Sequence, residues 1–429
     1  MKKNLHLGIL SGVIVLLSSA AVAQWTKTVL PAPPYGHGAL PGRVNALAAD
    51  GSSIYAGTLG GNLYYSVDNG GTWVLVDSGM TNSDITAIVT VSGSVYVGAY
   101  GNLANISYGG YGHGSGIYFT SDNGTHWRRA GATLADTNIF AMTLIDSEIV
   151  AGTWGGGAYI SSDQGATWSQ IVRGLDNPFV RTLAVGGIRL FAGTWGDGVF
   201  FSDDHGQSWT QSNLGINNLF VNSIVTDGPS VYMGNTEGVY KSGDGGFSWT
   251  LKDSGLTTSY INTFVVIHPN LILGTSGDGV FVSANNGESW MKVDTGLTDG
   301  YIYCFAVNGS KIFAGSLNGE VWSRPLAEII TAVNDRWKGD VANSFKLYQN
   351  YPNPFNPATK IVYQLAAPAR VTLRVFDMLG KVVATLVDGI KPPGTHEVMF
   401  DASHLSSGVY VYQIRIGDYT SSKKMVLMK

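Results

Sequence analysis

Two aspartates at equivalent places in a repeating sequence could do acid–base chemistry. Asp197 stands in Gly196-Asp197-Gly198 and Asp278 in Gly277-Asp278-Gly279, two repeats further on. A glycoside hydrolase needs two carboxylates, one on each side of the scissile bond. Aspartate also suits such turns because its side chain bonds to nearby backbone amides. The pair is therefore a candidate for catalysis, while the simpler interpretation is a role in the turns.

Aromatic residues gather on the same expected face and could bind a ligand. Trp154 and Trp195 stand in two Gly-Thr-Trp-Gly loops, and four more rings precede strands of the repeat. These four are Phe179, Phe220, Tyr260 and Tyr301, and a Gly/Tyr-rich insertion over 100–115 adds Tyr108 and Tyr111. Flat rings stack on sugars or hold peptides, and insertions on one face of a repeat protein often mark the binding face. The pattern predicts ligand contact at this face, although some of these rings would serve only to cap the core.

Several other chemistries are excluded by residue usage. Cys304 is the only cysteine, so no intrachain disulfide can form. The eight histidines show no metal-ligand spacing, and no helix follows the glycine-rich stretches, so we expect no metal and no cofactor. The net charge is −4, and from Ser344 onward ten Lys and Arg outnumber five Asp and Glu. The preceding segment is therefore acidic, which argues against nucleic acid as a partner.

The elements that must position these residues come from a sequence phrase that recurs six times. Its first copy is Ser66-x-Asp68-x-Gly70-x-Thr72-Trp73, and the Trp-to-Trp steps are 54, 41, 41, 40 and 41 residues. The Asp position of the six copies holds Asp68, Asp122, Asp163, Asp204, Asp244 and Asn285. A period near 40 residues with four short strands is typical of a β-propeller blade. The Asp side chain can accept turn amides, which predicts a structural role for all six.

The strands of one repeat can be assigned directly, and the two ends of the repeat region complement each other. In one unit we expect strands over 180–185, 189–192, 198–202 and 208–211. The first strands alternate small and large residues, which predicts that they pack as core. A seventh unit begins at Ile302 but stops at Pro325, before its outer strand. The stretch around Trp25 resembles the outer strand around Trp290, so we expect the N-terminal strand to complete a seven-bladed propeller.

These repeats resemble the Asp-box (BNR-type) superfamily, which includes sialidases, xyloglucan hydrolases, sortilin-like receptors and photosystem assembly factors. The resemblance covers 25–323 and implies the propeller fold, not one function. A sialidase needs three arginines around a carboxylate, a tyrosine nucleophile with a glutamate, and usually an Arg-Ile-Pro motif. That tripeptide is absent, and only Arg43 and Arg181 stand where a first strand opens onto the loop face. This departure argues against a sialidase.

The last 86 residues follow a different pattern. Alternating strands with Gly and Pro turns predict a small immunoglobulin-like β-sandwich over 344–429. Its segments Tyr351-Pro352-Asn353-Pro354-Phe355-Asn356-Pro357 and Ser407-Gly408-Val409-Tyr410 closely resemble the type A sorting domain of the bacterial type IX secretion system. The resemblance implies contact with that secretion machinery, passage through the outer membrane, and attachment to the cell surface or release. An ordinary adhesive module is the alternative.

The N-terminus predicts export. Lys2 and Lys3, an apolar run and Ala21-Val22-Ala23 are typical of a signal peptide over 1–23, and no later segment is apolar enough to span a membrane. We therefore expect a propeller over 24–326, a linker over 327–343 and the sorting domain over 344–429. The protein should pass through the periplasm to the cell surface or medium.

Taken together, the residues predict an exported propeller that binds a glycan or a surface protein through its loop face. A secreted glycoside hydrolase and a structural scaffold without a small ligand are the alternatives that the sequence leaves open.

Overall fold

The chain consists of two units made of β-structure. The computed structural model describes residues 24–32, 42–80, 84–91, 93–101, 115–131, 133–329, 345–365, 369–392, 394–416 and 419–429. The first unit ends at Ile329 and the second runs from Ile330 to Lys429. The predicted signal peptide and residues 330–343 of the predicted linker lie outside the described residues.

The described part of the first unit contains seven antiparallel four-stranded sheets, each formed by strands that follow one another along the chain except in the last. The first sheet contains β2 (Val44–Asp50), β3 (Ser53–Thr58), β4 (Leu63–Ser66) and β5 (Val74–Leu75). The second contains β6 (Asp84–Val91), β7 (Ser94–Tyr100), β8 (Gly116–Thr120) and β9 (Arg128–Ala130). The third contains β10 (Ile139–Ile145), β11 (Glu148–Thr153), β12 (Ala158–Ser161) and β13 (Ser169–Gln170). The fourth contains β14 (Val180–Gly186), β15 (Arg189–Thr194), β16 (Val199–Ser202) and β17 (Thr210–Gln211). The fifth contains β18 (Ser223–Asp227), β19 (Ser230–Gly234), β20 (Val239–Ser242) and β21 (Thr250–Leu251). The sixth contains β22 (Ile261–Ile267), β23 (Asn270–Thr275), β24 (Val280–Ser283) and β25 (Met291–Lys292).

The last sheet joins the two ends of the unit. It contains β26 (Ile302–Val307), β27 (Lys311–Ser316), β28 (Glu320–Pro325) and, as its outer strand, β1 (Thr26–Val29) from the N-terminus. Trp25 also takes the place of the outer-strand tryptophan of the other sheets. Its backbone N–H donates to the Thr295 carbonyl and its indole Nε1 to the Val293 carbonyl at 2.7 Å.

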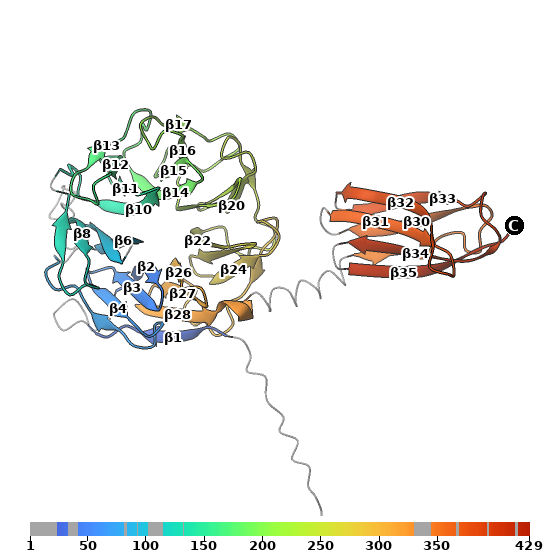
Figure 1. Ribbon diagram of the computed structural model, residues 1–429, viewed down its shortest axis with the longest axis horizontal. Helices are drawn as coiled ribbons and strands as arrows, with labels where there is room; N and C mark the ends of the chain where they lie inside the picture. The colour runs from blue at the N-terminus through green and yellow to red at the C-terminus, as the bar shows by residue number, and fades with distance from the viewer. Residues whose placement is uncertain are drawn as a thin grey trace, which may run out of the picture. The chain divides into compact units, whose positions relative to one another are not determined.

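The seven sheets form a closed ring, as Figure 1 shows. The first strand of each sheet contacts the first strands of the sheets before and after it, and β26 contacts β2. This is the radial arrangement of a β-propeller. Residues 326–329 add a helical turn after β28, in which Ile329 is buried.

A row of glycines sets how closely neighbouring sheets approach. Each second strand carries one glycine at the point where the first strand of the next sheet crosses it. The row is Gly57, Gly98, Gly152, Gly193, Gly234, Gly274 and Gly315. A Cβ atom on Gly193 would lie 2.5 Å from Val221 Cγ1, and one on Gly315 would lie 2.6 Å from Val44 Cγ1. Any side chain here would push the sheets apart, since cores pack without spare room.

Polar bonds tie sheets of the ring to the aspartate turn of the next sheet. The Tyr55 hydroxyl of the first sheet donates to Asn123 Oδ1 of the second at 3.3 Å. Asn308 Nδ2 of the last sheet donates to Asn69 Oδ1 of the first at 2.6 Å. The ring is therefore closed by a side-chain bond as well as by strand pairing.

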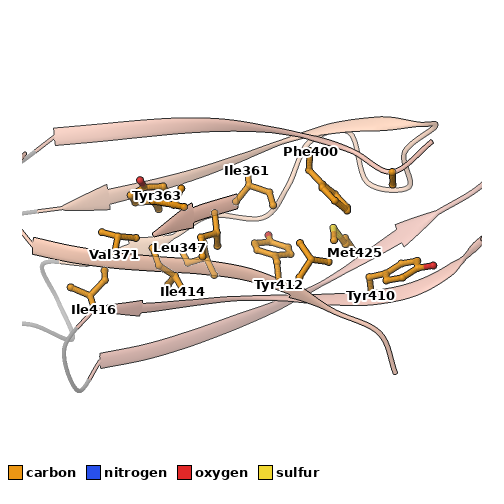
Figure 2. Packing of buried hydrophobic residues seen from close by; sticks show 14 of the residues in the cluster. Leu347, Ile361, Tyr363, Val371, Phe400, Tyr410, Tyr412, Ile414, Ile416 and Met425 are labelled. Carbon is orange, nitrogen blue, oxygen red and sulfur yellow. The ribbon is translucent and has the colours of Figure 1, made fainter. Parts of the chain in front are cut away.

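The second unit has two antiparallel sheets around one core (Figure 2). The smaller sheet contains β29 (Lys346–Leu347), β30 (Ala358–Leu365) and β33 (Gly394–Asp401). The larger contains β32 (Val382–Lys391), β31 (Ala369–Phe376), β34 (Gly408–Ile416) and β35 (Tyr419–Leu427). Both sheets contribute to the core, as Tyr363 and Tyr412 illustrate.

Buried residues attach the proline-rich segment of the second unit to these sheets. The Asn350 side chain donates to Thr359 Oγ1 and to the Pro352 carbonyl, and its backbone N–H donates to the Tyr412 hydroxyl. Phe355 is buried and its N–H donates to the Val426 carbonyl. These contacts explain why Asn and Phe occupy those positions.

Candidate functional site

The six aspartate turns are closed hydrogen-bond networks. Asp68 Oδ1 accepts the Ser66 hydroxyl and the Thr72 amide, and Asp68 Oδ2 accepts the Thr72 hydroxyl, all at 2.8 Å. These bonds, that of the Thr72 amide first, lower the pKa of Asp68 to about 2. In the sixth turn Asn285 Oδ1 likewise accepts the Ser283 hydroxyl and the Ser289 amide, while Asn285 Nδ2 donates to the Ser289 hydroxyl. Both side-chain oxygens of Asp68 therefore accept hydrogen bonds within the turn, so neither is available to bind a ligand.

At the other end of the sheets, six of the seven first strands contain a β-bulge, and the first strand of the fifth sheet, β18, pairs without one. Register shifts separate Val44 from Ala46 and Val180 from Thr182, with equivalent shifts in four further sheets. A bulged residue leaves the pairing pattern and its side chain is re-aimed. In each unit the residue directly after the first buried Val or Ile of the first-strand segment lines one cavity: Asn45, Thr86, Phe140, Arg181, Asn222, Asn262 and Tyr303.

This axial cavity has a volume of about 390 Å³ and is bounded by the first strands. Ala46 and Cys304, expected to be core residues, are buried and also line it. The first strands therefore do two jobs: they pack against each other and they form the wall of a hollow centre. A volume of this size suits a small ligand or one ring of a larger one.

Three charged side chains line the axial cavity. The Arg43 guanidinium lies 4.4 Å from the Tyr303 ring centroid and donates to Asn45 Oδ1 at 2.6 Å. Asp84 is buried and accepts the Gly60 amide at 2.8 Å, and burial raises its pKa although that bond and Arg43 oppose the rise. The Arg181 guanidinium lies 5.1 Å from the Trp195 ring centroid. The cavity wall thus has two cations and one carboxylate.

Aromatic side chains form a continuous run beside this cavity, which we call the aromatic rim. The rim consists of Tyr100, Phe140, Trp154, Phe179, Trp195 and Phe220. Ring centroids are 4.8 Å apart for Tyr100 and Phe140, 4.7 Å for Phe140 and Trp154, 5.9 Å for Trp154 and Trp195, and 5.2 Å for Trp195 and Phe220. Tyr100 and Phe140 also line the cavity, so rim and cavity are continuous.

The structure brings together four of the predicted ligand-binding residues and separates others. Trp154, Trp195, Phe179 and Phe220 belong to the rim, where Trp154 lies 5.1 Å from Phe179. Tyr260 and Tyr301 occupy equivalent places in the sixth and seventh units and are 38% and 43% exposed, outside the run of ring contacts. Tyr108 and Tyr111 lie outside the described residues.

Tyr100 and Phe140 were not predicted as members of the rim. The usable signal was positional: like Arg181 and Asn222 in their units, Phe140 directly follows a buried Val or Ile. Side-chain type alone gave no reason to single it out.

The two candidate catalytic aspartates occupy different environments. Asp278 forms an ion pair with Lys292 at 2.9 Å and accepts the Thr257 hydroxyl. Its pKa is lowered, because these contacts outweigh the desolvation that would raise it. A carboxyl held ionised is poorly suited to the general acid role. Asp197 is partly exposed, and neither residue lines the axial cavity.

A second cavity, of about 440 Å³, lies next to the fourth aspartate turn. Its wall includes Glu148, Asp204 and His205. His205 Nδ1 is 2.8 Å from Glu148 Oε2, and both Asp204 oxygens accept bonds from their own turn. The polar groups here already have partners, so we place the candidate site at the axial cavity.

Within the residues that the structure describes, no group of three His, Cys, Asp or Glu side chains could hold a metal ion. Over the same residues, no helix has the length and apolar character needed to cross a membrane.

The comparison that decides the role of the second unit is with protein families. Residues 349–428 match the family described as the secretion system C-terminal sorting domain. The second unit is a sorting domain. The protein is therefore exported by the type IX secretion system to the cell surface or the medium. No protein of curated function matches the sequence.

Solved structures resemble the chain in fold. PorZ, a surface component of the type IX secretion system of Porphyromonas gingivalis, is 15% identical with a TM-score of 0.52; the match covers 90% of this chain and 60% of PorZ. YCF48, solved with a D1 peptide, is 13% identical with a TM-score of 0.55 over 71% of this chain and 99% of that one. Virginiamycin B lyase from Staphylococcus aureus is 10% identical with a TM-score of 0.58, over 71% and 99%. At these identities the likeness establishes a propeller fold and no shared activity.

Proposed function

We propose that this protein is an exported seven-bladed propeller of the Asp-box type that binds a glycan through the aromatic rim and the axial cavity. Within this proposal 1–23 is the signal peptide, 24–326 the propeller, 327–343 the linker and 344–429 an immunoglobulin-like sorting domain. The seven sheets of the closed ring and the hydrogen-bonded aspartate turns support the blade count and the family.

One observation carries the binding proposal: the aromatic rim is continuous and opens onto a cavity with polar walls. Trp154 and Trp195 are only partly exposed but lie side by side, with ring centroids 5.9 Å apart. Sugars combine apolar ring faces with hydroxyl groups, so they suit a site where aromatic rings border amide and guanidinium groups. Asn45, Asn222 and Asn262 supply such amides in the cavity wall.

A glycoside hydrolase is less well supported. Asp278 is committed to Lys292 and Thr257, and neither it nor Asp197 lines the axial cavity. A structural scaffold would need neither a cavity nor a run of partly exposed rings. A surface protein that binds the rim is the other partner that the face could accept.

A glycan-array screen of the chain tests the proposal, followed by titration of each hit against Trp195→Ala. We expect the variant to lose at least about tenfold in affinity, equivalent to about 1.4 kcal/mol, because aromatic anchors dominate binding energy. Phe247→Ala is the control, since Phe247 is a 56% exposed ring in an aspartate turn.

Equal loss in both variants, or hits that bind Trp195→Ala unchanged, would refute the assignment of the rim. Release of reducing ends from a hit, abolished by Asp197→Ala or Asp278→Ala, would favour the hydrolase. An array without hits would favour a protein partner or a scaffold.

A further inference from the structure

The axial cavity contains a cation that pairs with no carboxylate among the described residues. Arg181 Nε is enclosed and makes no hydrogen bond, and the side chains nearest to the guanidinium charge include Tyr260 and Arg43. The guanidinium contacts the Trp195 ring instead, and burial lowers the pKa of Arg181. Enclosing a charged group without a hydrogen-bonded counter-ion is costly for a folded protein. The energetic cost of such a group is low only where a molecule outside the chain supplies the missing hydrogen-bond partner.

The neighbouring sheet contributes an unpartnered acceptor to the same cavity. Asn222 Oδ1 is buried and makes no hydrogen bond, whereas Asn222 Nδ2 donates to the Ile261 carbonyl at 3.0 Å. Asn222 and Arg181 each follow a buried valine, Val221 and Val180, in adjacent units, and both line the cavity. The cavity wall therefore contains one nitrogen of a cationic group, Arg181 Nε, and one amide oxygen, Asn222 Oδ1, that lack hydrogen-bond partners. Buried polar groups normally have partners, so two exceptions in one cavity point to a ligand.

The charges of the cavity wall favour an anion. Arg43 and Arg181 are its two cations, and they lie near enough for each to oppose the other's charge. The one carboxylate, Asp84, is near Arg43 and accepts the Gly60 amide. Arg43 therefore has a negative charge nearby. Arg181 is the cation for which a ligand would supply the negative charge.

We propose that the axial cavity binds the carboxylate group of an acidic sugar, with Arg181 as the anion contact and Asn222 accepting a ligand hydroxyl. The proposal rests on glycan binding at the rim and names the class of glycan. Arg–carboxylate bonds are charge-assisted and directional, which fits the free Nε. A hydroxyl donor fits the free Asn222 Oδ1, and a sugar ring can stack on Trp195 beside them. A neutral glycan would leave Arg181 uncompensated.

The test compares an oligogalacturonate with its methyl ester, two ligands that share a skeleton and differ in charge, by calorimetric titration of the chain. We expect the acid to bind roughly 10- to 100-fold more tightly than the ester, the range that a charged hydrogen bond gives. Arg181→Met should remove this preference while it keeps an unbranched side chain against Trp195. Arg173→Met, at an exposed arginine, removes the same charge elsewhere and should leave the preference intact.

Thermal unfolding of the variants separates binding from folding. Arg181→Met should have a melting temperature equal to or above that of the parent chain, because it removes a half-buried charge whose Nε makes no hydrogen bond. A large decrease would show that Arg181 is structural and would overturn the proposal. If acid and ester bind equally and both lose affinity in Trp195→Ala, the ligand is not specifically an acidic sugar, which refutes this inference. The proposed glycan binding at the rim would still be supported. Binding of neither ligand also overturns the inference, and the array then decides on the proposed function.

Discussion

Replacement of Trp25 tests whether the N-terminal strand holds the ring closed. Trp25 is 2% exposed, and its indole donates to the Val293 carbonyl at 2.7 Å. The strand that follows it, β1, pairs with β28 from Thr26↔Ser323 to Val29↔Glu320. In Trp25→Ala the side chain that fixes this strand to the last sheet is missing, and a cavity takes its place.

The magnitude follows from the loss of a buried tryptophan. Truncation of Trp to Ala in a core costs about 3–5 kcal/mol. At about 2 °C per kcal/mol for a unit of this size, the melting temperature should fall by roughly 6–10 °C. Trp25→Phe keeps most of the packing and loses the indole bond, which should cost about 1 kcal/mol. In this variant the Val293 carbonyl still accepts a hydrogen bond from Arg324 Nη1 at 3.3 Å, which limits the cost of losing the indole bond.

Differential scanning calorimetry of the chain measures both effects, and Val29→Ala is the matched control. Val29 lies at the end of β1, the strand that follows Trp25, and is 54% exposed, so its truncation should change the melting temperature little. If Trp25→Ala unfolds at the parent temperature, the N-terminal strand contributes nothing to the stability of the ring, and our account of closure is wrong.

Two further predictions concern the turns and the glycine row. The pKa of Asp68 is depressed to about 2, so its stabilising effect is complete above about pH 4, the unfolded value, and is lost as pH falls toward 2. Asp68→Asn, which copies Asn285, should weaken this acid dependence of the melting temperature; an unchanged profile would contradict the assignment. Gly193→Ala should destabilise the ring by about 1–3 kcal/mol through overpacking. Gly243→Ala, whose added Cβ meets nothing within 4 Å, is its control in urea titrations, and equal behaviour would refute the packing argument.

Local strand structure followed closely from the sequence. The strands expected over 180–185 and 189–192 correspond to β14 (Val180–Gly186) and β15 (Arg189–Thr194). Turn chemistry made this possible, because Gly187, with a φ of 65°, separates these two strands and the Asp204 turn separates β16 from β17. The pairing of β1 with β28 was also readable, since the residues around Trp25 repeat those around Trp290.

The axial cavity was not predictable to the same degree. Alternation of small and large residues indicates which side chains share a face, but a bulge changes the face without changing the residue types. The sequence placed Arg181 where a first strand opens onto the loop face, but it did not reveal the shift between Val180 and Thr182 or that Arg181 lines a cavity. That Arg181 Nε and Asn222 Oδ1 lack partners depends on the positions of all neighbouring atoms. The glycine row, by contrast, was visible in the sequence as a repeated Gly before Thr, Ala, Asn or Ser.

Hydrogen–deuterium exchange of the chain with and without a glycan-array hit tests the central claim most directly. Binding at the aromatic rim predicts slower exchange over 138–140, 153–157, 179–182 and 194–198, the segments that carry Phe140, Trp154, Phe179, Trp195 and Arg181. Protection confined to the aspartate turns or to residues 345–429 would place the ligand elsewhere and contradict binding at the axial cavity.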